Sequence, residues 1–245
     1  MKPLPFKIPR GSEASIKVDH EALEHFYPTY HTHEELQLTL VLRGHGTAYI
    51  GDRIISFNEG DIYLLGQHLP HVFKDDIRGN DSGIESISIF FLPDFLGPHF
   101  LEIPEAKNIT AVLTESIRGI RIKPEYEVSL RNKIIELLDI EGIARIMHLL
   151  SVLDGIAHSS HLEFITGPDY QKPKRQSDGQ KVNDVFNFLI ENYERDIRLA
   201  EVADVAIMSP TSFCRYFKQH TRKSYSTFLN ELRIGQACKL LIKND

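Results

Sequence analysis

Disulfide bonds, an export signal and membrane-spanning segments are all missing from this 245-residue chain. Only two cysteines occur, Cys214 and Cys238, so no disulfide framework is implied and a reducing compartment is expected. The N-terminus, MKPLPFKIPRGSE, lacks the apolar core of a signal peptide, and no apolar run approaches the length that spans a bilayer. We therefore exclude secreted disulfide-rich and membrane-spanning classes, and predict a cytoplasmic protein without a membrane partner.

Positive charge is scarce overall but unevenly distributed. The chain carries a net charge of −6, yet residues 172–245 contain 13 Lys or Arg and 9 Asp or Glu, or +4. Subtraction from the totals of 28 and 34 leaves 15 and 25 for residues 1–171, or −10. An acidic body with a mildly basic C-terminal segment is typical of a DNA-binding module joined to a sensor or dimerisation module. The length and the 42% hydrophobic content suffice for two modest domains.

Residues 199–218, LAEVADVAIMSPTSFCRYFK, have the pattern of a helix, a tight turn and a second helix. Ser209 is a good N-cap and Pro210 suits the first helical position. In the second helix, the inward face at helical spacing consists of Phe213, Tyr216 and Phe217, and the outward face of Thr211, Cys214, Arg215 and Lys218. Small residues of the preceding helix allow close packing against it: Val202, Ala203 and Ala206.

The run SPTSFCRYFKQHTRKSYSTFLNELRIGQACKLL resembles the first helix-turn-helix and connecting helix of AraC/XylS-type transcriptional regulators. The resemblance covers roughly residues 182–241, and the residues that carry it are Ser209, Arg215, Phe217, Lys218, Arg233, Ala237, Leu240 and Leu241. Two positions depart from the family: Ile207 replaces a turn residue that tolerates a positive φ, and Arg222 replaces a glycine. Family members continue with a second helix-turn-helix beyond the position of Asp245, so the resemblance implies a fragment or a truncated product.

Residues 1–92 contain short strand-like pieces separated by turn signals, which predict an antiparallel sandwich or small barrel. The pieces are QLTLVL, TAYI, RIISF, DIYLL and SISIFF. The phrase from HTHEELQL to HVF resembles the cupin-like sensor domain of AraC-type regulators, over about residues 30–91.

Four polar residues of this phrase are candidate ligand-binding residues. If the stretch is one strand, His31, His33, Glu35 and Gln37 project from the face opposite Leu36, Leu38 and Leu40, and His31, His33 and Gln37 are the candidates among them. The cupin resemblance implies that His71 faces this row. Metal-binding cupins have a glutamate where this chain has Gln37, and a neutral amide is a poor metal ligand. We therefore predict no metal and no cofactor; the histidines are expected to bond each other, the backbone or an organic ligand. His45 is expected in a solvated loop, and His68 near the same rim.

The fold class predicted is α+β: a cupin-like antiparallel β-barrel with accessory helices, then an all-α helix-turn-helix module. The domain boundaries predicted are 1–103 for the ligand-sensing domain, 104–165 for a helical region, 166–180 for an exposed linker and 181–245 for the DNA-binding module. Helical patterns at 125–138 and 141–158 fit packing on the barrel and dimer contact equally well. A stripe in 182–193 predicts the first helix of the DNA-binding module, and the linker is expected to let the domains move semi-independently.

The leading functional hypothesis is a transcriptional regulator that senses a small molecule, dimerises and inserts helix 210–220 into the DNA major groove. Arg215 is expected to contact a base, with Thr211 and Cys214 beside it. Phosphate contacts are expected from Lys218, Arg222 and Lys223. The family resemblance alone suggests a carbohydrate or related metabolite as effector. Two alternatives remain: a metal-dependent cupin enzyme, which Gln37 and the lack of a catalytic arrangement disfavour, and a degenerate regulator without specific DNA binding.

Overall fold

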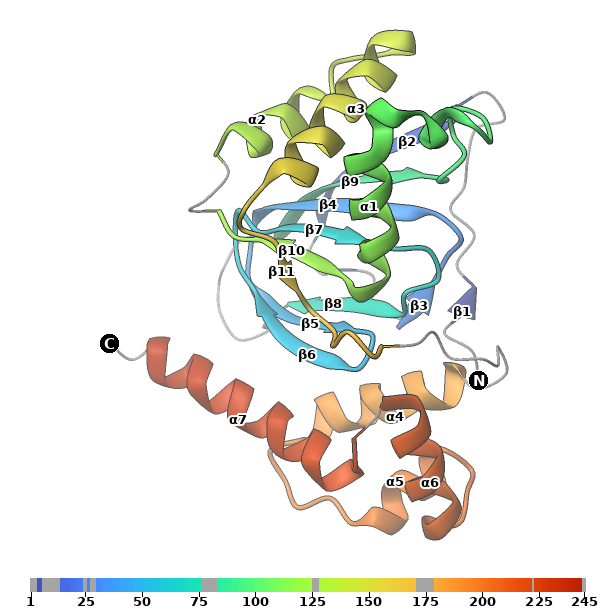
Figure 1. Ribbon diagram of the computed structural model, residues 1–245. Helices are drawn as coiled ribbons and strands as arrows, with labels where there is room; N and C mark the ends of the chain where they lie inside the picture. The colour runs from blue at the N-terminus through green and yellow to red at the C-terminus, as the bar shows by residue number, and fades with distance from the viewer. Residues whose placement is uncertain are drawn as a thin grey trace.

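The computed structural model describes residues 4–5, 14–23, 26, 30–75, 83–124, 128–170, 179–221 and 223–243. A β-barrel lies in the middle, helices cover it on one side, and a second helical unit lies on the opposite side (Figure 1). This arrangement confirms the predicted α+β class. Within the described ranges, the helices are all too short or too polar to cross a membrane.

Two sheets form the barrel. The first sheet has the order β1-β3-β8-β5-β6, with strands Leu4–Pro5, His31–Thr32, His71–Asp75, Gly46–Ile50 and Arg53–Phe57. The second has the order β11-β10-β7-β4-β9-β2, with strands Glu163–Phe164, Ile120–Ile122, Ile62–Leu65, Leu36–Arg43, Ile84–Phe91 and Ile16–Leu23. Strands β1 and β3 pair in parallel, and the other pairs are antiparallel. All five strand-like pieces of the sequence are confirmed as strands.

Strand β4 separates two environments by simple alternation. Leu36, Leu38 and Leu40 belong to the apolar cluster under the covering helices, whereas Gln37 and Thr39 point to the barrel interior. The predicted division of faces is therefore confirmed. The stretch from His31 is not one strand, because β3 ends at Thr32 and β4 begins at Leu36.

Three helices cover the second sheet: α1 (Lys107–Glu115), α2 (Val128–Glu136) and α3 (Gly142–His158). Short 3₁₀ turns flank α1 at Phe100–Glu102, Pro104–Ala106 and Ser116–Arg118. The buried faces of α2 and α3 pack on the sheet through Leu130, Ile134, Leu149, Val152, Leu153 and Ile156. Val128, Ile143 and Met147 remain exposed on the same two helices. One of the two alternatives, packing on the barrel, is thus observed, and an apolar surface is left over.

The second helical unit consists of α4 (Gly179–Asn192), α5 (Leu199–Val205), α6 (Pro210–Thr221) and α7 (Tyr225–Lys243). The amide of Ser212 donates to Oγ of Ser209 at 3.3 Å, so the predicted N-cap of α6 is confirmed. Residues predicted to face inward are all buried: Val202, Ala203, Ala206, Phe213, Tyr216 and Phe217. The turn between α5 and α6 places Ile207 at φ 55°, so it keeps the geometry that suits glycine or asparagine.

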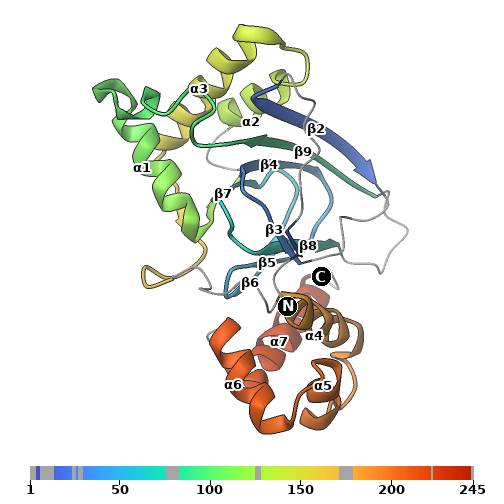
Figure 2. The ribbon, with the colours of Figure 1, turned by 90° about the vertical axis from the view of Figure 1, so that its right-hand side faces the viewer.

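The barrel and the second helical unit share one apolar cluster. Helices α4 and α7 are the helices of this unit nearest the barrel, directly below β5 and β6 (Figures 1 and 2). Tyr30, which immediately precedes β3, and Tyr49 and Val72 of the first sheet pack with Phe186 and Phe228 of α4 and α7. The structure therefore differs from the expected semi-independent domains, because aromatic contacts join them.

The predicted exposed linker, 166–180, is only partly outside the packed structure. Thr166 is buried, and both its amide and its hydroxyl donate to the carbonyl of Arg118, at 2.9 and 3.0 Å. Residues 171–178 lie outside the described residues, and α4 already begins at Gly179. The start of the predicted linker is thus anchored to the barrel side.

Candidate functional site

Three histidines meet inside the barrel, as predicted. Strand β3 supplies His31 and β8 supplies His71, and these two residues are direct partners in the strand register. Their ring centroids lie 4.4 Å apart, and those of His33 and His71 lie 5.2 Å apart. His33 and His71 are almost completely buried, and His31 is partly buried. The loop that interrupts the strand still brings His33 to the cluster.

Gln37 is the centre of a buried hydrogen-bond chain. Its Oε1 lies 3.0 Å from Nε2 of His33 and 3.0 Å from Nε2 of His71. Its Nε2 lies 2.8 Å from Oγ1 of Thr39, which in turn lies 2.9 Å from Oγ of Ser88. Sequence reasoning missed Thr39 and Ser88, although the parity of Thr39 with Gln37 along β4 was a usable signal.

Both buried histidines are held neutral. Removal from water lowers the pKa of His71 well below its usual value, and neighbouring His31 and His33 lower it further. Burial also lowers the pKa of His33, against the opposing effects of Gln37 and Glu35. A neutral imidazole carries one N–H, so each of these rings donates at only one of its two nitrogens.

The backbone selects which nitrogen donates. Nδ1 of His33 faces the carbonyl of Glu35 at 3.0 Å, and Nδ1 of His71 faces the carbonyl of Leu69 at 2.8 Å. With protons on both Nδ1 atoms, each Nε2 is an acceptor and points at the amide of Gln37. That amide satisfies both rings when its NH₂ group, rather than its oxygen, faces them, with Thr39 then donating to the oxygen. In this arrangement, the Nε2 atoms of both imidazoles accept hydrogen bonds from the one neutral amide of Gln37.

The same geometry could hold a metal ion. One ligand nitrogen from each of His31, His33 and His71 lies within 4.8 Å of the others. A histidine whose Nδ1–H donates to a backbone carbonyl has an unprotonated Nε2, which is the form that binds transition metals. Gln37 would contribute an uncharged oxygen where a carboxylate would neutralise the ion. The donor set therefore fits a metal incompletely.

Aromatic rings fill another part of the barrel interior. Rings of Phe57, Phe73 and Tyr63 pack edge to face, with centroids 5.2 to 5.6 Å apart, and Phe26 joins them. His45, predicted to be a solvated loop residue, is partly buried, whereas His68 is exposed at the rim with a φ of 56°. The histidine cluster thus occupies one part of the barrel interior, and the aromatic rings occupy another.

A separate cavity of about 280 Å³ lies on the other side of β4. It opens between β4, the turn after β7 and helix α1, and its lining includes Leu36, Gln67, Leu101, Thr110 and Leu113. Sequence reasoning did not predict this cavity, because its walls come from four segments that are distant in the chain. The hydroxyl of Thr110 already donates to the carbonyl of Leu101 at 2.7 Å, so this side chain is satisfied without a ligand.

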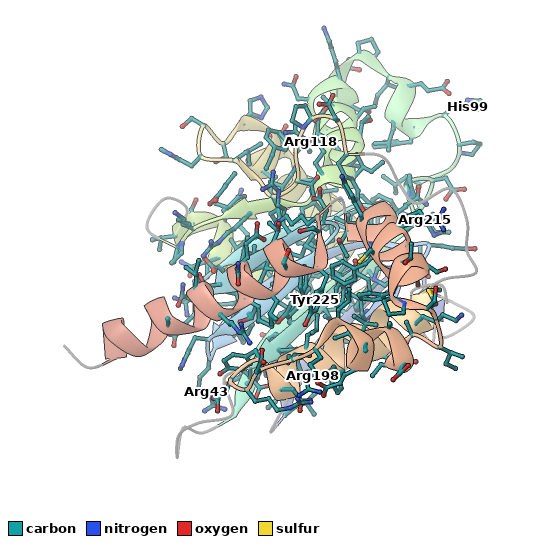
Figure 3. The ribbon with its side chains drawn as sticks, turned by 90° about the horizontal axis from the view of Figure 1, so that it is seen from below. Arg43, His99, Arg118, Arg198, Arg215 and Tyr225 are labelled. Atoms are coloured by element: carbon teal, nitrogen blue, oxygen red, sulfur yellow. The ribbon has the colours of Figure 1, made fainter. Side chains whose placement is uncertain are left out.

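The outward face of α6 is free of packing at four predicted positions: Thr211, Cys214, Arg215 and Lys218 are exposed. Figure 3 shows Arg215 at the outer side of α6, away from α7. The opposite face is anchored by Phe213 and Phe217, whose ring centroids lie 5.4 Å apart. Helix α6 therefore presents one short polar row on a rigid support.

The two other predicted DNA contacts have different outcomes. Arg222 lies outside the described residues. Lys223 forms an ion pair with Glu231 of α7, and its side chain is only 14% exposed. The prediction of a free phosphate contact from Lys223 is therefore not supported by its position. Arg233, part of the motif, instead holds the chain between α4 and α5 by donating to the carbonyls of Tyr193 and Arg195.

Comparisons with known proteins agree with this architecture. The AraC-like ligand-binding domain matches residues 18–97. An HTH-type transcriptional activator RhaR from Mannheimia succiniciproducens is 23% identical over 233 residues, which is 94% of this chain and 79% of that protein. An HTH-type transcriptional activator RhaS from Pectobacterium atrosepticum is 26% identical over 195 residues, which is 71% of this chain and 68% of that protein.

Solved structures give a weaker likeness. An apo ToxT variant from Vibrio cholerae shares 10% identity with a TM-score of 0.42, over 94% of this chain and 84% of that chain. The sequence matches span both the barrel and the second helical unit, and the relatives are transcriptional regulators. Together with the matched ligand-binding domain, they support a ligand-responsive regulator. The chain is therefore similar to AraC-type transcriptional regulators, in the barrel through the matched ligand-binding domain and over most of its length through the two activators.

Proposed function

We propose that α6 reads DNA in the major groove and that an effector in the barrel controls this reading. The observation that carries the proposal is the division of α6 into a buried aromatic face and an exposed polar row. An α-helix fits the major groove, where base edges present distinct donors and acceptors. A helix with one packed face and one free polar face is suited to that position.

Within the row, the side chains differ in what they can recognise. The guanidinium of Arg215 can donate two hydrogen bonds to O6 and N7 of a guanine, so it is the base-reading residue. Thr211 and Cys214 lie beside it and make short contacts to neighbouring bases. Lys218 lies one turn further and contacts phosphate, which fixes orientation without reading sequence. Arg222 is retained as a phosphate contact on the basis of sequence alone.

The effector proposed is a small uncharged molecule rich in hydroxyl groups, such as a carbohydrate. His33, His71 and Gln37 offer neutral imidazole and amide groups beside His31, because burial lowers the pKa of both buried histidines. Neutral donors and acceptors match hydroxyl groups better than they match a carboxylate or phosphate. The effector takes over the hydrogen bonds that Gln37 now makes to the two imidazoles.

A second copy of the chain is the proposed partner at the exposed apolar surface of α2 and α3. Val128, Ile143 and Met147 are exposed there, and Ile143 and Met147 are one helical turn apart. Palindromic DNA sites are read by two-fold symmetric dimers, so a dimer places two reading helices on one duplex.

Salt dependence of DNA binding tests the proposal without knowledge of the operator. Affinity for a random-sequence duplex should fall steeply with salt, and Lys218→Ala should weaken it and reduce the log–log slope by about 0.9 per phosphate contact. Asn230→Ala, on the exposed side of α7, is the matched control and should change neither. Binding that does not respond to salt, or an unchanged slope for Lys218→Ala, would contradict the role of α6.

One observation favours a second candidate function. The three histidine nitrogens within 4.8 Å of one another are the feature that a metal-dependent cupin enzyme would need. Metal analysis of the purified chain separates the two functions. We expect less than stoichiometric metal and an unchanged melting temperature after chelator treatment, whereas one bound ion per chain would favour the enzyme.

A further inference from the structure

Phe186 of α4 connects the barrel to the DNA-reading helix. Its ring is stacked on Phe228, with centroids 4.9 Å apart and planes 5° apart, and it faces Tyr49 of the barrel at 5.8 Å and 28°. Tyr30 of the barrel meets it edge-on at 5.1 Å, and Phe217 of α6 meets it edge-on at 6.2 Å. One side chain therefore contacts barrel residues on one side and the support of α6 on the other.

The barrel residues in this contact are chain neighbours of the histidine cluster. Tyr30 precedes His31, and Val72 follows His71. Side chains alternate across a strand, so His71 faces the barrel interior while Val72 faces the helical unit. Strand β5 alternates in the same way: Tyr49 pairs with Val72 on the face toward the helical unit, and Ile50 pairs with His71 on the interior face. The cluster and the aromatic contact are thus separated by the thickness of one sheet.

Hydrogen bonds tie these segments together. The hydroxyl of Tyr30 donates to the carbonyl of Gly51 at 2.9 Å, and the amide of Gly51 donates to the carbonyl of Pro70 at 2.8 Å. A displacement of His31 or His71 therefore reaches Tyr30 and Val72 through short, hydrogen-bonded backbone. Loose surface loops are not needed for the connection.

We propose that the sheet formed by β3, β8 and β5 transmits the state of the histidine cluster to the helical unit, with Tyr30, Tyr49 and Val72 pressing on Phe186. This inference rests on the proposed effector role of the same cluster. The outward row of α6 is exposed while the units are docked, so the contact sets how the reading helix is held and does not cover it. By linkage, release of the contact changes the cluster as much as the cluster changes the contact.

Hydrogen exchange of the full chain, without DNA, tests the coupling from the barrel side. Gln37→Leu removes the shared partner of the two imidazoles, and Gln37→Glu keeps the shape but adds a charge. Either variant should accelerate amide exchange in α4 and α7 by about fivefold or more, with α5 unchanged. His99→Ala, at an exposed position immediately before the 3₁₀ turn Phe100–Glu102, is the control and should leave all helices as in the parent chain.

Coupling in the reverse direction, from the aromatic contact to the histidine cluster, is measured by the imidazole NMR signals of His31, His33 and His71. Tyr49→Ala should shift them, and Leu23→Ala, which removes an exposed side chain at the end of β2, should not. Unchanged α4 and α7 exchange in both Gln37 variants, or acceleration that includes α5 equally, would overturn the proposal, as would unchanged imidazole signals in Tyr49→Ala. None of these measurements uses DNA, so a failure of the coupling and a failure of DNA reading are separately visible.

Discussion

His33 and His71 direct their Nε2 atoms at the same atom of Gln37, each at a distance of 3.0 Å. His33 and Gln37 are only four residues apart, in a loop and in β4, whereas His71 comes from the distant strand β8. Their convergence places two neutral imidazoles around one amide. Neutrality is the condition of the arrangement, because two imidazolium ions at this separation would repel each other inside the barrel.

Stability should therefore decrease in mildly acidic solution. The folded-state pKa values of His33 and His71 are depressed by burial, so below the unfolded value of about 6.5 the unfolded chain binds more protons. The stabilising contribution is complete above that value and is lost as the pH falls towards the folded pKa values. Each pH unit in this window should weaken folding by up to about 1.4 kcal/mol per histidine.

The measurement is the free energy of unfolding in denaturant at pH 7.5 and pH 5.0. His71→Asn should reduce the difference between the two pH values, whereas the exposed control His99→Asn should not. An unchanged pH dependence in His71→Asn would show that the acid sensitivity originates elsewhere.

Replacement of Ile207 by glycine should increase the stability of the fold. It is a β-branched residue at φ 55° and its side chain is 83% exposed, so the turn bears backbone strain without a packing benefit. Ile207→Gly should raise the free energy of unfolding by about 1 kcal/mol. The control Ile234→Gly, also at an exposed isoleucine but inside α7, should lower it by about 0.5–1 kcal/mol. Destabilisation by both substitutions would contradict strain at the turn.

Removal of only one partner of the buried ion pair between Asp61 and Arg121 should lower the stability of the fold. Oδ2 of Asp61 accepts from Nη2 of Arg121 at 2.6 Å, from the amide of Asn58 at 2.8 Å and from the hydroxyl of Tyr63 at 3.1 Å. Asp61→Ala should lower stability by about 3–5 kcal/mol, because it leaves a buried guanidinium without its partner. Combination with Arg121→Met should recover part of the loss, and additive losses in the double mutant would argue against a direct pair.

An acidic substitution on the exposed surface of α3 should separate a dimer. Ile143→Asp and Met147→Asp place a charge where a second copy would bury an apolar side chain, so the dissociation constant should rise about 10-fold or more. Analytical ultracentrifugation at micromolar concentration measures this. The control Leu23→Asp, at an exposed position on β2, should remain dimeric like the parent. A parent chain that is already monomeric would refute the proposed partner.

The helical unit could be predicted in detail because its signals are local. Ser209 and Pro210 mark the start of α6, and aromatic residues at helical spacing mark its buried side, so the exposed row followed directly. Lys223 was misjudged because Glu231, eight residues away, is its partner across a turn, and no helical spacing indicates such a pair.

The barrel was predicted less completely because its contacts are between distant segments. Strand β2 was missed, since most of its side chains are partly or fully exposed and it carries a weak alternation of apolar residues. The stripe that contains Phe186 reads as an ordinary helix core, and the same pattern serves packing within the helical unit and packing on the barrel. Docking of the two units depends on which aromatic surfaces meet, and one sequence does not specify that.

Selection of duplexes from a random pool tests the central claim, that Arg215 reads a base from α6, most directly. The parent chain should enrich a motif that contains a guanine, and Arg215→Ala should lose the preference at that base pair, equivalent to about 1–3 kcal/mol, while it keeps the preferences at other positions. Lys218→Ala should enrich the same motif as the parent with lower overall recovery. Enrichment of an identical motif, with the same guanine preference, by Arg215→Ala would contradict the account.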